Sequence, residues 1–171
     1  MTAGGEAPSF RWPKALVLAL LIVIVDQWSK QAIGAAFRHG ESLFVTPFFN
    51  LVLVYNKGAA FSFLSGASGW QREFFIGVTA VALAAIAWMI RRHRSEVLFC
   101  WSLTLIAAGA AGNLIDRVQH GHVIDFLDFH LGGWHFWAFN FADSSITIGA
   151  MLLILDSFRP RPAAAPDSQS G

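Results

Sequence analysis

Four aspartates lie close together in one polar stretch of the sequence, residues 109–147. Of the 11 acidic residues in the chain, this stretch contains Asp116, Asp125, Asp128 and Asp143. It joins two apolar runs, residues 97–115 and 139–158, which are long enough to enter a bilayer. Carboxylates are costly to bury at the ends of membrane helices, so we interpret this stretch as the place where the chemistry occurs.

Two carboxylates held near one another can activate water without a metal. They cannot both ionise easily, so one of them keeps a proton. The ionised member can deprotonate a water molecule, while the protonated member donates a hydrogen bond to a substrate carbonyl. This is the arrangement of aspartic proteases, and it needs no nucleophilic side chain. From the residues alone, the choice of two among the four aspartates stays open.

Two helices that meet at one membrane surface would bring these aspartates together. Asn113 and Asp116 share a helical face at the end of the first apolar run. Asn140 and Asp143 share a face at the start of the second run. A single loop joins the two helices, so both polar faces reach the same surface. The first turn of a helix also favours an anion, which suits Asp143.

The composition excludes a water-soluble protein. The chain has 171 residues, of which 55% are hydrophobic and 13% are charged, whereas soluble domains carry about 25% charged residues. We therefore expect an integral membrane protein with room for one compact bundle. The net charge of +1 gives no reason to expect nucleic acid as a partner. The single cysteine, Cys100, excludes an internal disulfide.

Hydropathy predicts an all-α membrane protein built as a bundle of four transmembrane helices. The spans are expected at about residues 13–37, 73–90, 97–116 and 140–158. They form one membrane domain, residues 11–158, between disordered termini at 1–10 and 159–171. No small-x-small cleavage site follows the first apolar run, so we expect an uncleaved span there rather than a signal peptide.

Two long connections, residues 38–72 and 117–139, leave the bundle on the same side. Residues 51–55 have the composition of a β-strand and precede a turn signal, Asn56-Lys57-Gly58. We expect a small β-sheet that forms a cradle in the first connection, and a short interfacial loop in the second. On local grounds Asn56 is most simply a turn residue.

Lysine and arginine residues gather before the first span, between the second and third spans, and after the fourth. They are Arg11, Lys14, Arg91, Arg92, Arg94, Arg159 and Arg161. By the positive-inside rule both termini are cytoplasmic. The two long connections, and with them the aspartate-rich stretch, then lie on the other side of the membrane.

Asp26 interrupts the first apolar run, and Lys30 follows it four residues later on the same helical face. The two residues could form an ion pair that snorkels to the membrane surface from the helix end. They could equally support the site inside the bundle. The residues alone leave both interpretations open.

Two other classes of function compete with an aspartate pair. His120, His122 and Asp125 form an HxHxxD pattern that could bind zinc in a metal-dependent hydrolase, and His130 and His135 lie nearby in the sequence. Solvent-exposed loop histidines are commoner than such sites, so we expect no metal. A non-enzymatic transporter or channel could use the carboxylates as a proton relay. It would need charged groups deep in the bundle, whereas the acids gather at one end.

Five short blocks of the sequence resemble motifs of the lipoprotein signal peptidase family, also called signal peptidase II. They are DQWSK at 26–30, YNKGAAFSF at 55–63, GNLIDR at 112–117, VIDF at 123–126 and FNFADS at 139–144. The blocks occur in the order of the family and extend from the first predicted span to the fourth. Several blocks together are far more specific than any one of them.

The resemblance implies an aspartyl endopeptidase of the bacterial inner membrane, with its active site near the periplasmic face. It would remove the signal peptide from prolipoproteins, just before a cysteine that carries diacylglyceryl. We expect it to need no cofactor and to act as a monomer on lipidated prolipoproteins among membrane lipids. Such a substrate stays in the membrane, so the aromatic residues of the long connections would lie along the interface.

The same resemblance assigns roles to individual residues. The catalytic pair is Asp125 and Asp143, and this choice over the other two aspartates rests on the family motifs. The polar residues around the substrate and the pair are Asn56, Asn113, Asp116, Arg117 and Asn140. Asp26 and Lys30 are implied to be structural polar residues of the first helix.

Overall fold

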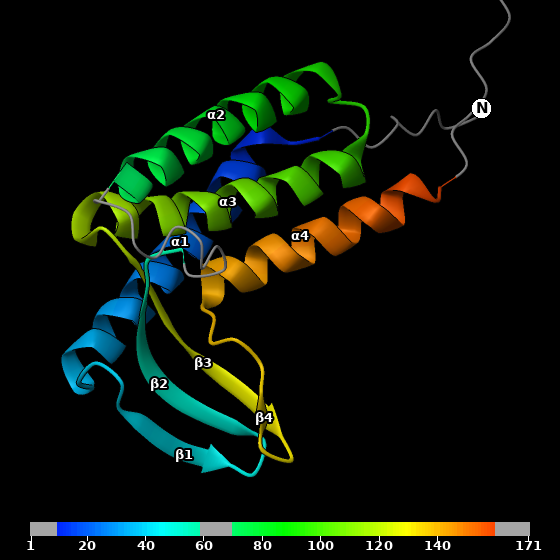
Figure 1. Cartoon of the computed structure of the whole chain (residues 1–171). Helices are drawn as coiled ribbons and strands as arrows, with labels where there is room; N and C mark the ends of the chain where they lie inside the picture. The colour runs from blue at the N-terminus through cyan, green and yellow to red at the C-terminus, as the bar shows by residue number, and fades with distance from the viewer. Residues whose placement is uncertain (1–9, 59–69, 160–171) are drawn as a thin grey trace, which may run out of the picture.

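A computed structural model describes residues 10–58 and 70–159 of the protein. In this part of the chain four helices form a bundle, and a four-stranded antiparallel sheet extends from one end of it (Figure 1). The helices are α1 (Trp12–Ala36), α2 (Trp70–Arg92), α3 (Val97–His120) and α4 (Phe141–Ser157). The strands are β1 (Ser42–Thr46), β2 (Phe49–Asn56), β3 (Val123–Leu131) and β4 (Trp134–His135).

Three of these helices, α1, α2 and α3, are long and apolar enough to cross a membrane. Helix α4 has 17 residues, which is short of the usual span of about 20 residues. Large apolar side chains of the helices face outward, since Leu20, Val81 and Ile154 are 60%, 71% and 58% exposed. The protein is therefore a helical membrane protein, in which three of the four predicted spans have the length and hydropathy of a membrane helix.

Helix α3 is the centre of the bundle, because α1, α2 and α4 all pack against it. Two glycines allow α3 and α4 to approach closely. A β-carbon at Gly109 would collide with the backbone carbonyl of Ala142. A β-carbon at Gly149 would lie 2.7 Å from the carbonyl oxygen of Ser102. Small residues of this kind are common where membrane helices meet, and here they bring the start of α4 beside the last turns of α3.

Local signals set the helix ends nearest the sheet. Asn140 is the N-cap of α4, and its side-chain oxygen accepts a hydrogen bond of 2.9 Å from the backbone N–H of Asp143. Gly121 ends α3 with a φ of 76°, a left-handed conformation that favours glycine. The chain then enters β3 at Val123. The helices and the strand that carry the aspartates therefore meet at one end of the bundle.

The strands follow the order β1-β2-β3-β4 across the sheet. In the pairing of β2 with β3, Val54 lies opposite Asp125 and Asn56 lies opposite Val123. Side chains alternate between the two faces of a sheet. Asn56 and Asp125 therefore lie on the same face, on neighbouring strands.

The second connection differs from the expectation drawn from the sequence. Instead of a short interfacial loop at 117–139, this segment contributes the last turn of α3 and both β3 and β4. The start of β3 is buried on both faces, because Val123, Ile124 and Phe126 are all buried. It therefore lacks the alternating pattern that reveals a half-exposed strand. The cradle is built from both connections.

The ordered structure includes Phe10, one residue before the predicted start of the membrane domain. Phe10 was assigned to a disordered N-terminus, yet it is buried, and its ring meets those of Trp12 and Trp101 edge-on with centroids 5.5 Å apart. Such aromatic contacts hold the residue in place before α1 begins. The rest of the predicted disordered termini, apart from Arg159, lies outside the described residues, as do residues 59–69 of the first connection.

Candidate active site

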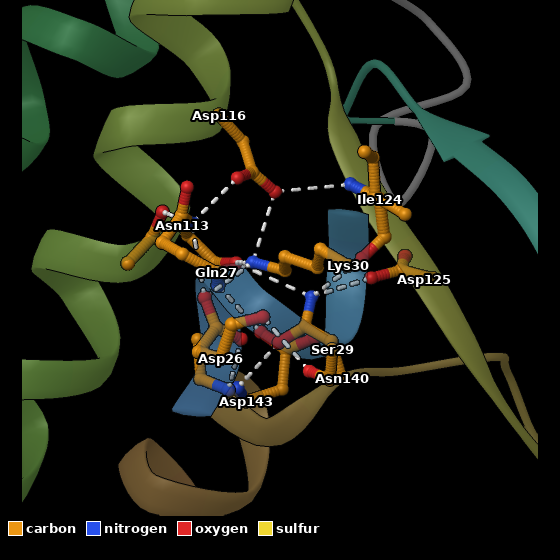
Figure 2. A network of polar contacts seen from close by, with 12 residues as sticks. Asp26, Gln27, Ser29, Lys30, Asn113, Asp116, Ile124, Asp125, Asn140 and Asp143 are labelled. Atoms are coloured by element: carbon orange, nitrogen blue, oxygen red, sulfur yellow. Dashed lines mark hydrogen bonds and ion pairs between the residues drawn. The ribbon is translucent and has the colours of Figure 1, made fainter. Parts of the chain in front are cut away.

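Polar side chains from α1, α3, β3 and α4 converge where the sheet meets the bundle (Figure 2). We call one group the anchor network; its members are Asp26, Gln27, Lys30 and Asp116. We call the other group the aspartate pair; its members are Asp125 and Asp143. Two asparagines connect the groups, Asn113 and Asn140.

Lys30 is the centre of the anchor network. Its Nζ lies 2.8 Å from Asp26 Oδ2, 2.9 Å from Asp116 Oδ2 and 3.0 Å from Asn113 Oδ1. An ammonium has three N–H groups, so all of its donors are used. Lys30 is only 1% exposed. This burial excludes a side chain that snorkels to the membrane surface, one of the two interpretations left open by the sequence.

The two carboxylates of the anchor network also bind backbone groups of the elements around them. Asp26 Oδ1 accepts the N–H of Ala142 at 2.9 Å and so ties α1 to the first turn of α4. Asp116 Oδ2 accepts the N–H of Ile124 at 3.1 Å and so ties α3 to the residue next to Asp125. Removal of one partner from a buried ion pair leaves an uncompensated charge and is costly. The network therefore holds the elements that carry the aspartate pair.

Gln27 belongs to the anchor network, and the sequence analysis did not select it. Its Nε2 donates to Asp116 Oδ1 at 2.8 Å, to the carbonyl of Gly112 at 3.1 Å and to Asp26 Oδ2 at 3.2 Å. The available signal was its place beside Asp26, where an amide interrupts an apolar run. Its neutral amide satisfies Asp116 Oδ1, which Lys30 leaves unoccupied, and it shares Asp26 Oδ2 with Lys30, without adding charge.

Asn113 forms hydrogen bonds with both Lys30 and Asp143, and so links the anchor network to the aspartate pair. Its Oδ1 accepts from Lys30, which leaves its Nδ2 to donate to Asp143 Oδ1 at 2.7 Å. Asn140 contacts both members of the pair. Its Nδ2 donates to Asp125 Oδ1 at 2.7 Å, and its Oδ1 accepts the backbone N–H of Asp143. The orientation of the Asn113 amide thus follows from the buried ammonium of Lys30, and that of the Asn140 amide follows from its contacts with the aspartate pair.

Asp125 is almost completely enclosed. It is 2% exposed, and its second oxygen accepts a hydrogen bond of 2.9 Å from Asn56 Nδ2. Burial raises the pKa of Asp125 from 3.8 to about 7, the negative charge of Asp143 adds to the rise, and the hydrogen bonds from Asn56 and Asn140 oppose it. Asp125 therefore carries a proton over much of the acid range.

The two remaining aspartates have charged or titratable partners of their own. Asp116 is ion-paired with Lys30, as described above. Asp128 accepts hydrogen bonds from Asn50 Nδ2 at 3.0 Å and from His135 Nδ1 at 2.9 Å. Although burial raises it, the hydrogen bonds from His135 and Asn50 hold the pKa of Asp128 below its ordinary value. The structure thus leaves Asp125 and Asp143 as the two aspartates joined to each other through Asn140.

Comparison with known sequences identifies the family of this fold and site. A model of a family described as Signal peptidase (SPase) II matches residues 18–159. The chain belongs to the signal peptidase II family. This membership confirms the resemblance seen in the five sequence blocks, and it makes the protein an aspartic peptidase of a bacterial membrane. It decides against the transporter alternative.

Similar proteins support the assignment to signal peptidase II. The lipoprotein signal peptidase of Cupriavidus taiwanensis is 55% identical over 157 residues, which cover 92% of this chain and 88% of that protein. The lipoprotein signal peptidase of Burkholderia vietnamiensis is 58% identical over 144 residues, which cover 84% of this chain and 87% of that protein. A solved bacterial membrane enzyme matches the fold with a TM-score of 0.81 at 33% identity, covering 92% of this chain and 100% of its own.

Within this signal peptidase II chain, Asn56 serves both the turn and the site. Its Oδ1 accepts the backbone N–H of Gly58 at 2.9 Å, which is the local turn that the sequence predicted. Its Nδ2 holds Asp125. The turn hydrogen bond orients the amide so that its nitrogen faces the aspartate.

Arg117 lies at the edge of the site, between α3 and α2. Its Nη1 donates to the carbonyl of Asn113 at 3.4 Å, and its guanidinium lies 5.1 Å from the ring centroid of Phe75. Arg72 of α2 donates to the carbonyls of Arg117 and Val118 at 3.0 and 2.6 Å. These contacts tie α2 to the last turns of α3.

The histidines of the HxHxxD pattern and Asp125 make different contacts. The ring of His122 packs against Tyr55 with centroids 4.2 Å apart and the ring planes tilted by 40°, while Asp125 accepts hydrogen bonds from Asn56 and Asn140. Within residues 10–58 and 70–159, no three histidine, cysteine or acidic side chains are arranged to hold a metal ion. In the part of the chain that the structure describes, the zinc alternative therefore finds no ligand set.

Proposed function

We propose that Asp125 and Asp143 are the catalytic pair of this membrane aspartic peptidase. With this pair the enzyme removes the signal peptide from prolipoproteins and cleaves just before the diacylglyceryl-modified cysteine. The observation that carries the proposal is the position of the Asn140 side chain. Its Nδ2 donates a hydrogen bond to Asp125, and its Oδ1 accepts one from the backbone N–H of Asp143. One short side chain thus connects two aspartates, neither of which forms an ion pair within the described residues.

The environments of the two aspartates assign them different roles. Burial favours a protonated Asp125, which suits the acid that donates a hydrogen bond to the substrate carbonyl. Asp143 lies in the first turn of α4, where the helix dipole favours an anion, and it accepts a hydrogen bond from Asn113. Asp143 is therefore the base that activates water.

The proton transfers follow from these roles. The carboxylate of Asp143 takes a proton from water, and the resulting hydroxide attacks the scissile carbonyl carbon while Asp125 gives its proton to the carbonyl oxygen. In the second step Asp143 gives its proton to the leaving nitrogen as the C–N bond breaks. Asp125 regains a proton from the collapsing diol. The pair ends each cycle with the one shared proton with which it began.

The other site residues support this pair and its substrate. Asn113 and Asn140 orient the two carboxylates, while Asn56 holds Asp125 from the neighbouring strand. Asp116 acts through the backbone of β3, so we assign it a positioning role. We assign Arg117, whose guanidinium lies over Phe75 of α2, the role of meeting the substrate backbone at the edge of the site.

We also propose that α4 crosses the membrane as a fourth span of one membrane domain, residues 11–158. Its 17 residues extend about 26 Å at 1.5 Å per residue, and exposed apolar side chains cover it, including Met151, Ile154 and Leu155. By the positive-inside rule, the distribution of lysine and arginine supports a topology with both termini in the cytoplasm and the sheet outside. In cells, an impermeant reagent added outside should label a cysteine introduced at Leu43 but not one at Arg92, after replacement of Cys100. The opposite labelling pattern would reverse the topology.

The exposed side chains of the sheet suit a substrate that remains anchored in the membrane. Large apolar side chains are exposed on its strands and turns: Leu43, Phe44, Phe48, Leu131, Trp134 and Trp137. Aromatic and aliphatic groups of this kind favour the membrane interface. We infer that the enzyme acts as a monomer, without a cofactor, on lipidated prolipoproteins that reach the site along this interface.

Cleavage of matched precursors tests the proposed substrate. The purified full chain should cleave a diacylglyceryl-modified precursor and leave the same precursor without the lipid intact. Activity should survive prolonged treatment with a chelator, because none of the proposed steps uses a metal. Equal cleavage of both precursors would refute the lipid requirement. Activity lost to the chelator and restored by zinc would refute the aspartate mechanism.

A further inference from the structure

The end of the bundle opposite the aspartate pair contains a hollow between α1 and α2. Both helices pack against α3 there, and a space of about 150 Å³ remains between them. Small side chains from all three helices line it, among them Ala19, Ala87 and Ala107. Trp12, in the first turn of α1, lines its end. None of the residues that line this hollow belongs to the anchor network or the aspartate pair.

The walls of this hollow suit a hydrocarbon chain. Leu83 and Ile86 contribute aliphatic surface, and the hydroxyl of Thr104 is already used because it donates to the carbonyl of Cys100 at 2.8 Å. A water molecule needs two to four polar partners, so a hollow with these walls has little to hold one. Inside a bilayer, the available apolar filling is an acyl chain.

The end of the bundle beside this hollow is strongly basic. Five cationic side chains occur at the start of α1 and around the turn between α2 and α3: Arg11, Lys14, Arg91, Arg92 and Arg94. The one acidic residue in the same segments, 10–20 and 88–100, is Glu96. Among residues 10–58 and 70–159, the ion pairs that form do not involve any of the five cations. Within the described residues, no ion pair neutralises these five charges, and such an excess of cations favours an anion.

Arg94 connects the basic end to the hollow. Its guanidinium lies 5.8 Å from the ring centroid of Trp12, the residue that lines the end of the hollow. The backbone N–H of Phe10 donates to the carbonyl of Arg94 at 3.3 Å, so the α2–α3 turn is held against the start of α1. A ligand with an acyl chain in the hollow would therefore place its polar group beside Arg94.

We propose that this place is a binding site for one anionic phospholipid of the surrounding membrane. One acyl chain fills the hollow between α1 and α2, and the phosphate meets Arg94 with help from Arg11. A guanidinium presents paired N–H donors that match phosphate oxygens. The excess of cations favours a lipid with net negative charge over a zwitterionic lipid. Because the ligand binds the folded bundle, it raises the stability of the protein by mass action.

Binding of defined lipids to the purified full chain tests the proposal. We would titrate phosphatidylglycerol and phosphatidylcholine with identical acyl chains in a neutral detergent, and measure bound lipid by native mass spectrometry together with the thermal unfolding midpoint. Phosphatidylglycerol should bind more tightly and raise the midpoint further. Arg94→Gln should weaken its binding about fivefold, the effect of one cation near a lipid phosphate, and weaken phosphatidylcholine by a smaller factor, because the choline cation offsets the charge of its phosphate. The matched control is Arg38→Gln, an exposed arginine at the other end of the bundle.

A second pair of variants tests the hollow itself. Ala87→Leu places a larger side chain in the hollow and should weaken binding of both lipids, whereas Ala84→Leu, on the exposed face of the same helix, should not. Cleavage of a lipidated precursor in detergent checks that each variant is folded. Equal binding of the two lipids to the unmodified protein would overturn the proposal. So would an unchanged affinity in Arg94→Gln, or equal effects of the two alanine substitutions.

Discussion

The anchor network and the aspartate pair each contain two carboxylates at the same end of the bundle, but only the first holds a cation. In the anchor network, Lys30 lies within 2.9 Å of an oxygen of both Asp26 and Asp116. In the pair, Asp125 and Asp143 receive neutral amide donors from two asparagines. The bound ammonium compensates the charge of its carboxylates and engages their oxygens, whereas burial of the pair without a bound cation favours a retained proton on Asp125. The same residue type thus serves as an anchor in one group and as a proposed acid or base in the other.

The largest expected effect comes from removing proton transfer in the pair. Asp125→Asn and Asp143→Asn should each lower the cleavage rate about a thousandfold or more, because asparagine keeps the shape of the side chain but cannot exchange the proton. The measurement is the rate on a lipidated precursor, with thermal unfolding as a check of folding. Asp128→Asn is the matched control on the same strand and should change the rate little. An essential Asp128 with a dispensable Asp125 would show that the pair is wrongly assigned.

Removal of the Lys30 ammonium should leave Asp26 and Asp116 to repel each other. Lys30→Met leaves two buried carboxylates without their partner, and we expect it to lower the free energy of unfolding by about 3–5 kcal/mol. Chemical denaturation in detergent measures this loss. Lys57→Met, which removes an exposed lysine, should have little effect. If the two variants were equally stable, Lys30 would not hold the elements as described.

The pH dependence of cleavage separates the two members of the pair. Cleavage requires a protonated Asp125, whose pKa is raised to about 7, so kcat/KM should fall as the pH rises through that value. It should also fall in acid, as the base Asp143 becomes protonated, which makes the profile bell-shaped. Rates between about pH 4 and about pH 9 test this. A rate that rises steadily above pH 7 would contradict the acid role of Asp125.

Asp125 and Asp128 should change the stability of the protein in opposite directions as the pH rises. The pKa of Asp125 is raised by folding, so the stability it contributes is present below 3.8 and is lost as the pH rises to about 7. The pKa of Asp128 is lowered, so its contribution is present above its unfolded value and is lost as the pH falls. Unfolding midpoints of Asp125→Asn should therefore fall less toward neutral pH than those of the unmodified protein. Midpoints of Asp128→Asn should fall less toward acid pH, and slopes of the same sign would refute the contrast.

The smallest effect is expected at Gln27, the neutral member of the anchor network. Gln27→Leu removes donors to two buried carboxylates while it keeps most of the side-chain volume, so it should cost about 1–2 kcal/mol of stability. Lys30 keeps the charges paired, which limits the loss. Gln31→Leu changes an exposed glutamine of the same helix and serves as the control. A loss as large as that of Lys30→Met would give Gln27 a greater role than its contacts indicate.

The sequence by itself determined the class of the protein and most of its helices. Hydropathy and length are local properties, so the spans at α1, α2 and α3 were predicted within a few residues of their observed bounds. The turn at Asn56 is also local, and the structure shows it. The family motifs then selected Asp125 and Asp143, which the structure brings together through Asn140.

Only the tertiary structure decided which partner each aspartate takes. The spacing of Asp26 and Lys30 predicted their pairing, but nothing local indicated that Lys30 also binds Asp116, which lies on another helix. That contact depends on how closely α1 and α3 pack, since a β-carbon at Gly112 would lie 2.6 Å from Asp26 Oδ2. The pairing of β3 with β2, which places Asn56 beside Asp125, is likewise set by contacts between distant segments. A carboxylate becomes an anchor or a proposed catalytic group according to the neighbours that packing brings to it, and those neighbours are not encoded in its own stretch of sequence.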